Sequence, residues 1–146
     1  MWYNVIMAGL LKSPIHAVIS KNIMLISYTG RKSGIEYTTP VNYWLVNDGD
    51  KKLLLTTSKA ERVWWRNFLG EQPAALQLRG KRVEALGTVV DDRTEKVRLF
   101  WALFTQHPQI GRYFQIALDR NHQPIADDVE RTAGQTILVC FVLSKA

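Results

Sequence analysis

The stretch that decides the fold runs from Ile26 to Trp44 and reads ISYTGRKSGIEYTTPVNYW. Two runs rich in β-branched and aromatic residues flank a short basic turn, Thr29-Gly30-Arg31-Lys32-Ser33-Gly34. This arrangement predicts an antiparallel hairpin, because β-rich runs separated by glycine-containing turn residues favour strand pairing. Working outward, we expect strands over 23–29 and 36–46, with Pro40 indicating an edge strand or a bulge.

The turn between these strands is the candidate binding site. Gly30 and Gly34 are expected to adopt positive φ and to leave backbone N–H groups facing outward. Arg31, Lys32 and Ser33 add charge and hydrogen-bond donors around the same point. The turn could therefore hold an anion such as phosphate. A solvated basic turn is the alternative interpretation, because Lys, Ser and Gly are ordinary turn residues.

The length and composition predict a single domain over residues 1–146. The chain is 47% hydrophobic and carries a formal net charge of +6, which favours a phosphorylated cofactor, nucleic acid or an acidic membrane surface as partner. Its one cysteine, Cys140, excludes a disulfide framework and a cysteine-based metal site within the chain, and a buried strand thiol is expected. We expect a cytoplasmic location, since neither a secretory signal nor a membrane-spanning run is present.

Residues 1–18 carry apolar side chains at roughly helical spacing. An amphipathic helix is expected there, lying across the sheet or forming a homodimer interface. A peripheral contact with a membrane surface, through the aromatic end of the helix, is the alternative.

The rest of the chain alternates between strand and helix patterns. We expect a turn at 47–50, a strand at 53–57, a helix within 58–69 and strands at 74–78 and 83–90. Helices are expected within 93–134: the first has an apolar face that includes Trp101, the second covers 109–118, and one or two helical turns lie between 119 and 134. A last strand is expected at 135–144. These six antiparallel strands with flanking helices suit a mainly β, α+β fold. A small closed or partly closed β-barrel is expected, because closure removes exposed sheet edges.

Three motifs in this order resemble one known family. They are the turn Thr29–Gly34, the element Thr38-Thr39-Pro40 and the element Trp64-Trp65-Arg66-Asn67-Phe68. Together they resemble the deazaflavin (coenzyme F-420)-dependent nitroreductase and quinone reductase family, which has a split β-barrel related to FMN-binding oxidoreductases. The resemblance covers about 26–90, with a weaker echo at 107–115 and in the last strand.

The resemblance implies a cofactor site. Arg31, Lys32, Ser33 and Gly34 would line the phosphate and acidic tail of the deazaflavin coenzyme. Thr39 and Pro40 would approach its ring or ribityl chain, and Trp64 and Asn67 would border the same groove. Two departures from the family pattern are Tyr37, where a basic residue is common, and the short approach Ser58–Val63. Lys59 is expected to replace part of the lost anion binding.

The implied reaction is hydride transfer from the reduced deazaflavin to a small electron acceptor such as a quinone or nitro compound. No metal and no protein nucleophile are required. His16, His107 and His122 are far apart in sequence and are expected to be surface or capping residues. Tyr113 could donate a hydrogen bond to the reduced oxygen of the acceptor, or could pack in the core beside Phe114.

Other functions stay open at this point. An FMN-dependent oxidoreductase on the same barrel would use the same basic turn for one phosphate. A non-catalytic carrier of flavin, deazaflavin or lipid would bind in a similar groove. Nucleic-acid binding is discounted, because the aromatic residues occupy predicted core positions instead of alternating with the basic residues.

Overall fold

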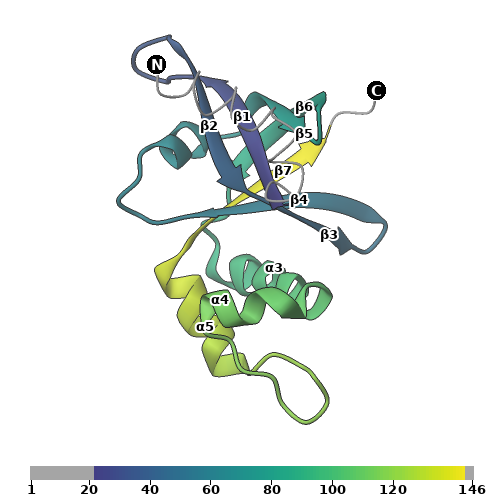
Figure 1. Cartoon of the computed structure of the whole chain (residues 1–146). Coiled ribbons are helices and arrows are strands. Elements are labelled where there is room, and N and C mark those ends of the chain that lie inside the picture. Colours follow the sequence, from purple (N-terminus) through teal and green to yellow (C-terminus); the bar gives the residue numbers. More distant parts are fainter. Residues whose placement is uncertain (1–21, 144–146) are drawn as a thin grey trace.

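The computed structural model describes residues 22–143 (Figure 1). The predicted helix over 1–18, and with it the expected dimer or membrane contact, lies outside the described residues. The described part holds one antiparallel sheet with the strand order β2-β1-β5-β6-β7-β4-β3. The strands are β1 Ile23–Thr29, β2 Glu36–Asn42, β3 Trp44–Asp48, β4 Lys51–Ser58, β5 Gln72–Leu78, β6 Lys81–Val89 and β7 Ile137–Leu143.

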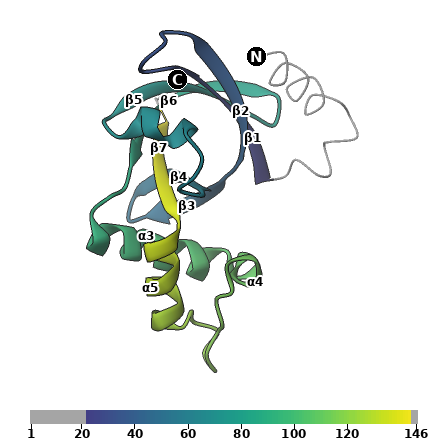
Figure 2. The ribbon, with the colours of Figure 1, turned by 90° about the vertical axis from the view of Figure 1, so that its left-hand side faces the viewer.

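The sheet is curled into a half-barrel. Seen from the side, the strands follow an arc around a central interior, and the α-helices of the described part lie together beyond one end of it, whereas the 3₁₀ helix that follows β4 lies against the barrel (Figure 2). The helices are the short 3₁₀ helices η2 Trp64–Phe68 and η3 Pro108–Ile110 and the α-helices α3 Arg93–Gln106, α4 Gly111–Phe114 and α5 Ala126–Gln135. The fold is therefore mainly β with flanking helices, as expected.

The predicted hairpin is confirmed. β1 pairs with β2 in antiparallel register from Ile23 opposite Asn42 to Thr29 opposite Glu36. Among the described strands, β2 pairs with β1 alone, so β2 is an edge strand. An edge strand tolerates proline because its outer side has no strand partner, so a missing N–H on that side breaks no ladder hydrogen bond.

The strand expected over 36–46 is two strands, so the sheet has seven strands and not six. Side chains keep pointing alternately to the two faces of the sheet where β2 ends and β3 begins: Val41 and Tyr43 lie in the barrel interior, and Trp44 lies on the helix side. What changes is the hydrogen-bonding partner, from β1 to β4. The Tyr43 N–H donates to the Asn22 carbonyl at 2.8 Å instead of joining a ladder. Sequence alternation cannot reveal such a change of partner.

Two predicted helices are shorter than expected. In the stretch 58–69 only η2 is helical; it follows a turn in which the Arg62 N–H donates to the Lys59 carbonyl at 3.1 Å. The helix expected over 109–118 ends at Phe114, because Gln115 adopts a left-handed conformation with φ 59°. By contrast, α5 is longer than the one or two turns expected between 119 and 134.

Helix α3 begins where the sequence predicts. The Asp92 carboxylate caps it by accepting a hydrogen bond from the Glu95 N–H at 2.9 Å. Its buried side chains are Leu99, Phe100, Leu103 and Phe104. Trp101, expected on this apolar face, is 37% exposed, because it lies about 160° around the helix from the buried Leu99 and Leu103.

Two apolar clusters hold the structure together, one on each face of the sheet. On β7, Val139 and Phe141 point into the barrel interior, whereas Leu138 points toward the helices. Gly87 on β6 leaves room for the interior aromatics, since a Cβ there would overlap the Phe141 ring. Cys140 lies on β7 as expected, half-buried on the helix side, and burial raises the pKa of its thiol to about 11.

Candidate functional site

The basic turn is closed by its own backbone. The Gly30 N–H donates to the Ile35 carbonyl at 2.8 Å, and the Gly34 N–H donates to the Gly30 carbonyl at 2.9 Å. The expectation that both N–H groups face outward is therefore wrong. Gly34 has the predicted positive φ, at 70°, but Gly30 does not. Gly30 is required for space, because a Cβ there would lie 2.7 Å from Ser33 Oγ and 2.8 Å from the Tyr37 ring.

Asn67 fastens this turn to η2. Its Oδ1 accepts a hydrogen bond from the Arg31 N–H at 2.8 Å, and its Nδ2 donates to the Trp64 carbonyl at 3.0 Å. The Asn67 amide thus holds the turn in place by backbone contacts that do not depend on the side chain at position 31. The Ser33 hydroxyl is also engaged, with Tyr37 OH and the Ile35 N–H both at 3.2 Å.

A hollow of about 390 Å³ opens beside the turn, and we call it the turn hollow. Its lining residues are Tyr28, Gly30, Arg31, Lys32, Ser33, Tyr37, Val63, Arg66 and Asn67. Four of the predicted cofactor-binding residues meet here: Arg31, Lys32, Ser33 and Asn67. Gly34, which was also predicted to bind the cofactor, is not among the residues that line the hollow.

The floor of the turn hollow is aromatic. Tyr28 and Tyr37 face each other across β1 and β2, and their rings stack with centroids 5.9 Å apart. Burial raises the pKa of Tyr28, while a hydrogen bond to the Thr39 side chain acts in the opposite direction. Tyr28 therefore stays neutral at physiological pH, and the two stacked rings offer the hollow a flat, partly polar surface.

A second hollow of about 440 Å³ lies between the edge strand β2, the end of β4 and α4; we call it the α4 hollow. Its lining residues are Ile23, Thr39, Pro40, Val41, Asn42, Thr57, Ser58, Lys59, Arg62, Trp64, Tyr113, Phe114 and Thr136. It brings together the other predicted residues Thr39, Pro40, Lys59, Trp64 and Tyr113. Tyr37 lines one hollow and Thr39 the other, and Val63 of the turn hollow stands between Arg62 and Trp64 of the α4 hollow. The two hollows therefore adjoin along β2, and we call the pair the crevice.

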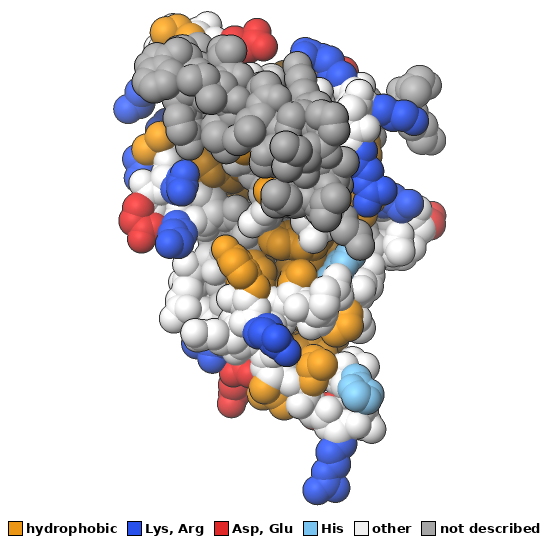
Figure 3. Space-filling model, viewed as in Figure 1, with side chains coloured by type: hydrophobic (Ala, Val, Ile, Leu, Met, Phe, Trp, Pro, Cys, Tyr) orange, Lys and Arg blue, Asp and Glu red, His pale blue; other side chains and the backbone are white. Residues whose placement is uncertain are grey.

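The crevice is strongly positive. Five cations line it, Arg31, Lys32 and Arg66 in the turn hollow and Lys59 and Arg62 in the α4 hollow. No Asp or Glu is among the lining residues, and none of the five cations forms an ion pair with another residue of the described part. On the face drawn in Figure 3, lysine and arginine side chains lie along both margins, with an acidic side chain among those at the left, and apolar side chains lie toward the centre.

Tyr113 stands at the rim of the α4 hollow. It is 73% exposed, and its ring meets the Phe114 ring edge-on at 5.1 Å. The alternative of core packing is therefore wrong. Its phenol lies at the mouth of a hollow, where it could reach a bound molecule.

The histidines in the described part are not in the crevice. His107 ends α3, and its Nε2 lies 2.6 Å from the Leu45 carbonyl, as expected for a capping residue. His122 is an exposed turn residue with φ 60°. His16 lies outside the described residues. Within 22–143, no cluster of His, Cys, Asp or Glu could hold a metal ion, and no helix is long and apolar enough to cross a membrane.

Sequence reasoning missed Tyr28, Val63, Arg62 and Arg66 as lining residues. A signal for the tyrosine was present, since a residue opposite Tyr37 in a hairpin shares its face. Arg62 and Arg66 are four residues apart, a spacing that places two side chains on one face only in a regular helix. In the structure Arg62 precedes η2, so the two arginines line different hollows.

Comparisons with known proteins concern the fold. No family model matches the chain, and no curated protein matches it. Among solved structures, the chain is similar to the protein Atu2129, of unknown function, from Agrobacterium tumefaciens, with a TM-score of 0.50 and 11% identity over 92% of this chain and 56% of that one. The chain thus spans little more than half of that protein.

Two further structures are similar at lower TM-scores. One is a protein of Clostridium acetobutylicum related to general stress protein 26, of the pyridoxinephosphate oxidase family. Its TM-score is 0.46, at 13% identity over 92% of this chain and 84% of that one. The other is the FAD and heme binding protein of Mycobacterium smegmatis, with a TM-score of 0.47 at 12% identity over 92% of this chain and 72% of that one. The curled seven-stranded sheet with its helices fits a split-barrel α+β fold.

Proposed function

We propose that this protein is an oxidoreductase that holds a phosphorylated flavin-type coenzyme in the crevice and passes a hydride to a small acceptor. The observation that carries the proposal is the set of five cations around two adjoining hollows that no carboxylate lines. An anionic ligand would gain most from such a surface, because charge-assisted hydrogen bonds are stronger than neutral ones. The ordered resemblance of the three sequence motifs supports the same ligand class.

The residues present fit such a coenzyme. The turn hollow supplies Arg31, Lys32 and Arg66 for phosphate, above the stacked rings of Tyr28 and Tyr37. The α4 hollow supplies an apolar wall and hydroxyl groups for the coenzyme's ring system and for an acceptor stacked against it. Hollows of 390 and 440 Å³ fall in the range of small-molecule sites, about 300–1,000 Å³.

Deazaflavin is favoured over FMN by the amount of charge. One phosphate carries about two negative charges, whereas three cations line the turn hollow alone: Arg31, Lys32 and Arg66. A coenzyme with a phosphate and an acidic tail would use all three. FMN, with its single phosphate, is the alternative coenzyme on the same site.

When bound, the reduced coenzyme would supply a hydride, which is two electrons with one proton, and a quinone acceptor would take one further proton from solvent to become the hydroquinone. The protein's own residues bind and orient the coenzyme and the acceptor and shelter them from water. Trp64, which is only 5% exposed, forms a rigid wall of the α4 hollow. Tyr113 can donate its phenolic hydrogen to an oxygen on which negative charge develops.

Stopped-flow oxidation of the reduced deazaflavin coenzyme tests the proposal, with menadione and a nitroaromatic compound as acceptors. We expect acceptor-dependent oxidation that is faster than the uncatalysed reaction. The same measurement with reduced FMN decides between the two coenzymes. Saturable coenzyme binding without oxidation by any acceptor would point instead to a non-catalytic carrier.

A further inference from the structure

We infer that the acceptor itself carries an anionic group, which Lys59 and Arg62 bind in the α4 hollow. This inference rests on the proposed function and names the substrate class of the same site. It begins from the division of the crevice: no cation lines both hollows. The structure therefore offers two separate positions for anions along β2.

The second position is built by one turn. The Arg62 N–H donates to the Lys59 carbonyl at 3.1 Å, so both residues belong to a single turn that follows β4. The Ser58 hydroxyl donates to the same Lys59 carbonyl at 3.0 Å and is 8% exposed, which anchors the start of the turn. Both cationic side chains are exposed and line the α4 hollow.

Neither cation has a protein partner in the part of the chain that the structure describes. The ion pairs there involve Arg82, Arg93, Arg98 and Arg131. Phosphate bound at Arg31 and Lys32 would leave Lys59 and Arg62 uncompensated in the adjoining hollow. A neutral acceptor would gain nothing from them, whereas an acceptor with a carboxylate or sulfonate would form charge-assisted hydrogen bonds.

The other residues of the α4 hollow indicate the shape and the hydrogen-bonding groups of the acceptor. Pro40, Trp64 and Phe114 provide apolar surface, and Thr39 and Tyr113 provide hydroxyl groups. A flat conjugated molecule suits the apolar wall, and its carbonyl oxygen could accept a hydrogen bond from Tyr113. The acceptor class is therefore a conjugated carbonyl compound with one anionic substituent.

The test compares naphthoquinone with naphthoquinone sulfonate, which differ in one anionic group. The measured quantity is the ratio of kcat/KM for the sulfonate to that for the neutral quinone, with the reduced coenzyme held at a fixed saturation. We expect the wild-type ratio to exceed one, and the Lys59→Gln, Arg62→Gln double variant to lower it by roughly ten-fold. Lys52→Gln and Arg120→Gln, which remove exposed charges outside both hollows, should leave it unchanged.

A binding measurement separates this inference from the proposed function. Isothermal titration with naphthalene sulfonate, which cannot be reduced, needs no coenzyme and no turnover. We expect the double variant to bind it about ten-fold more weakly than wild type. Equal affinity in the two proteins would overturn the inference, as would a drop in coenzyme affinity with no change in the acceptor ratio. Failure of both quinones to oxidise the coenzyme would overturn the proposed function, whatever the titration shows.

Discussion

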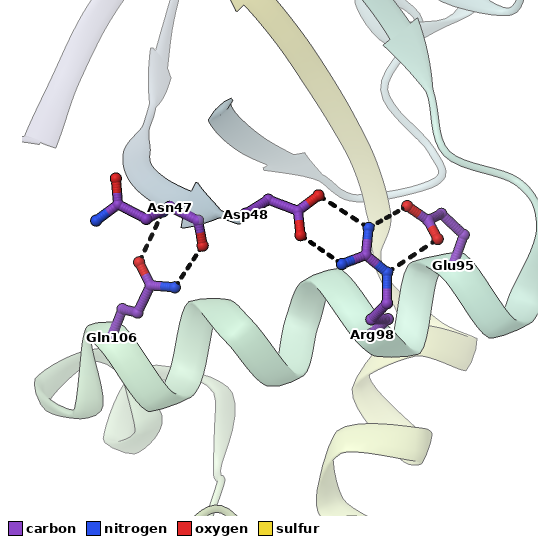
Figure 4. A network of polar contacts seen from close by, with 5 residues as sticks. All are labelled: Asn47, Asp48, Glu95, Arg98 and Gln106. Atoms are coloured by element: carbon purple, nitrogen blue, oxygen red, sulfur yellow. Dashed lines mark hydrogen bonds and ion pairs between the residues drawn. The ribbon is translucent and has the colours of Figure 1, made fainter. Parts of the chain in front are cut away.

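Arginine serves opposite purposes at the helical end of the molecule and in the crevice. On α3, the Arg98 guanidinium donates two hydrogen bonds to the Asp48 carboxylate, at 2.6 and 3.0 Å, and also pairs with Glu95 (Figure 4). In the crevice, Arg31 and Arg66 have no carboxylate partner within the described residues. Paired charge at the helical end links helix to sheet, whereas the charge in the crevice is free for a ligand.

The two sheet edges show the same contrast. The Gln106 side chain accepts from the Asn47 N–H at 2.8 Å and donates to the Asn47 carbonyl at 2.7 Å, so α3 covers the free edge of β3 (Figure 4). The opposite edge, β2, lines the crevice along Thr39 and Pro40. One edge is closed for stability, and the other borders the space that we assign to the coenzyme. Substitutions at the helical end should change stability, and those in the crevice should change binding.

The largest effect is expected from Leu103→Ala at the helical end. Leu103 is fully buried between α3 and the sheet, and such truncations cost about 2–5 kcal/mol. Urea unfolding measures the loss, with Leu69→Ala, at a site 52% exposed, as the matched control. The control should lose less than about 1 kcal/mol. Similar losses in both variants would contradict the packing described for α3.

The second effect concerns the crevice. Replacing Arg31 and Lys32 together by alanine should lower coenzyme affinity ten-fold or more, because each direct charge-assisted contact contributes roughly 1.5–3 kcal/mol. The fold should persist, since Asn67 binds the backbone N–H of residue 31 and not its side chain. Fluorescence titration measures the affinity, and a Lys52→Ala, Arg120→Ala double variant controls for net charge. Unchanged coenzyme affinity in the folded variant would contradict the binding role and favour the alternative interpretation of a solvated basic turn.

A smaller effect is expected from Tyr113→Phe. Loss of one hydrogen bond to developing charge should slow coenzyme oxidation by up to about ten-fold without abolishing it. His107→Ala and His122→Ala should slow it less, because neither histidine lines the crevice. Stopped-flow kinetics of the three variants provide the measurement. Complete inactivity of a folded histidine variant would refute a mechanism in which the coenzyme carries the chemistry.

The smallest effect is the pH dependence of the Arg98 network. The Arg98 guanidinium lowers the pKa values of Asp48 and Glu95 below their ordinary values of 3.8 and 4.5. Because the folded pKa values lie below the unfolded ones, this stabilisation is present above about pH 5 and is lost as the pH falls through the lowered values. Arg98→Gln should therefore cost at most about 1 kcal/mol near pH 7. The urea midpoints of wild type and variant should converge toward pH 2; a constant difference would contradict the assignment.

The hairpin was predictable because its signals are local. Gly34 and the β-rich runs on either side of it act within a few residues, and the structure places β1 and β2 where the pattern indicates. The division at Tyr43 was not predictable, since the apolar alternation continues unchanged while the strand partner switches to β4. The periodicity of apolar residues within a segment does not show which distant strand that segment pairs with.

The site was predictable only in part. The three motifs indicated residues that the structure gathers into two adjoining hollows, but not that Lys59 and Arg31 would lie in different ones. Arg62 and Arg66 were missed because their positions depend on where η2 begins. That start depends on the packing of Trp64 and Phe68 in the barrel interior, not on a capping side chain.

The central claim is that the basic turn holds the phosphate of a flavin-type coenzyme. A parallel titration of the wild-type protein with the deazaflavin coenzyme, FMN and riboflavin tests it most directly, because riboflavin differs from FMN only in lacking the phosphate. We predict saturable binding of the deazaflavin coenzyme and of FMN, and binding of riboflavin at least ten-fold weaker than that of FMN. Equal affinity for FMN and riboflavin, or no saturable binding of any of the three, would contradict the claim.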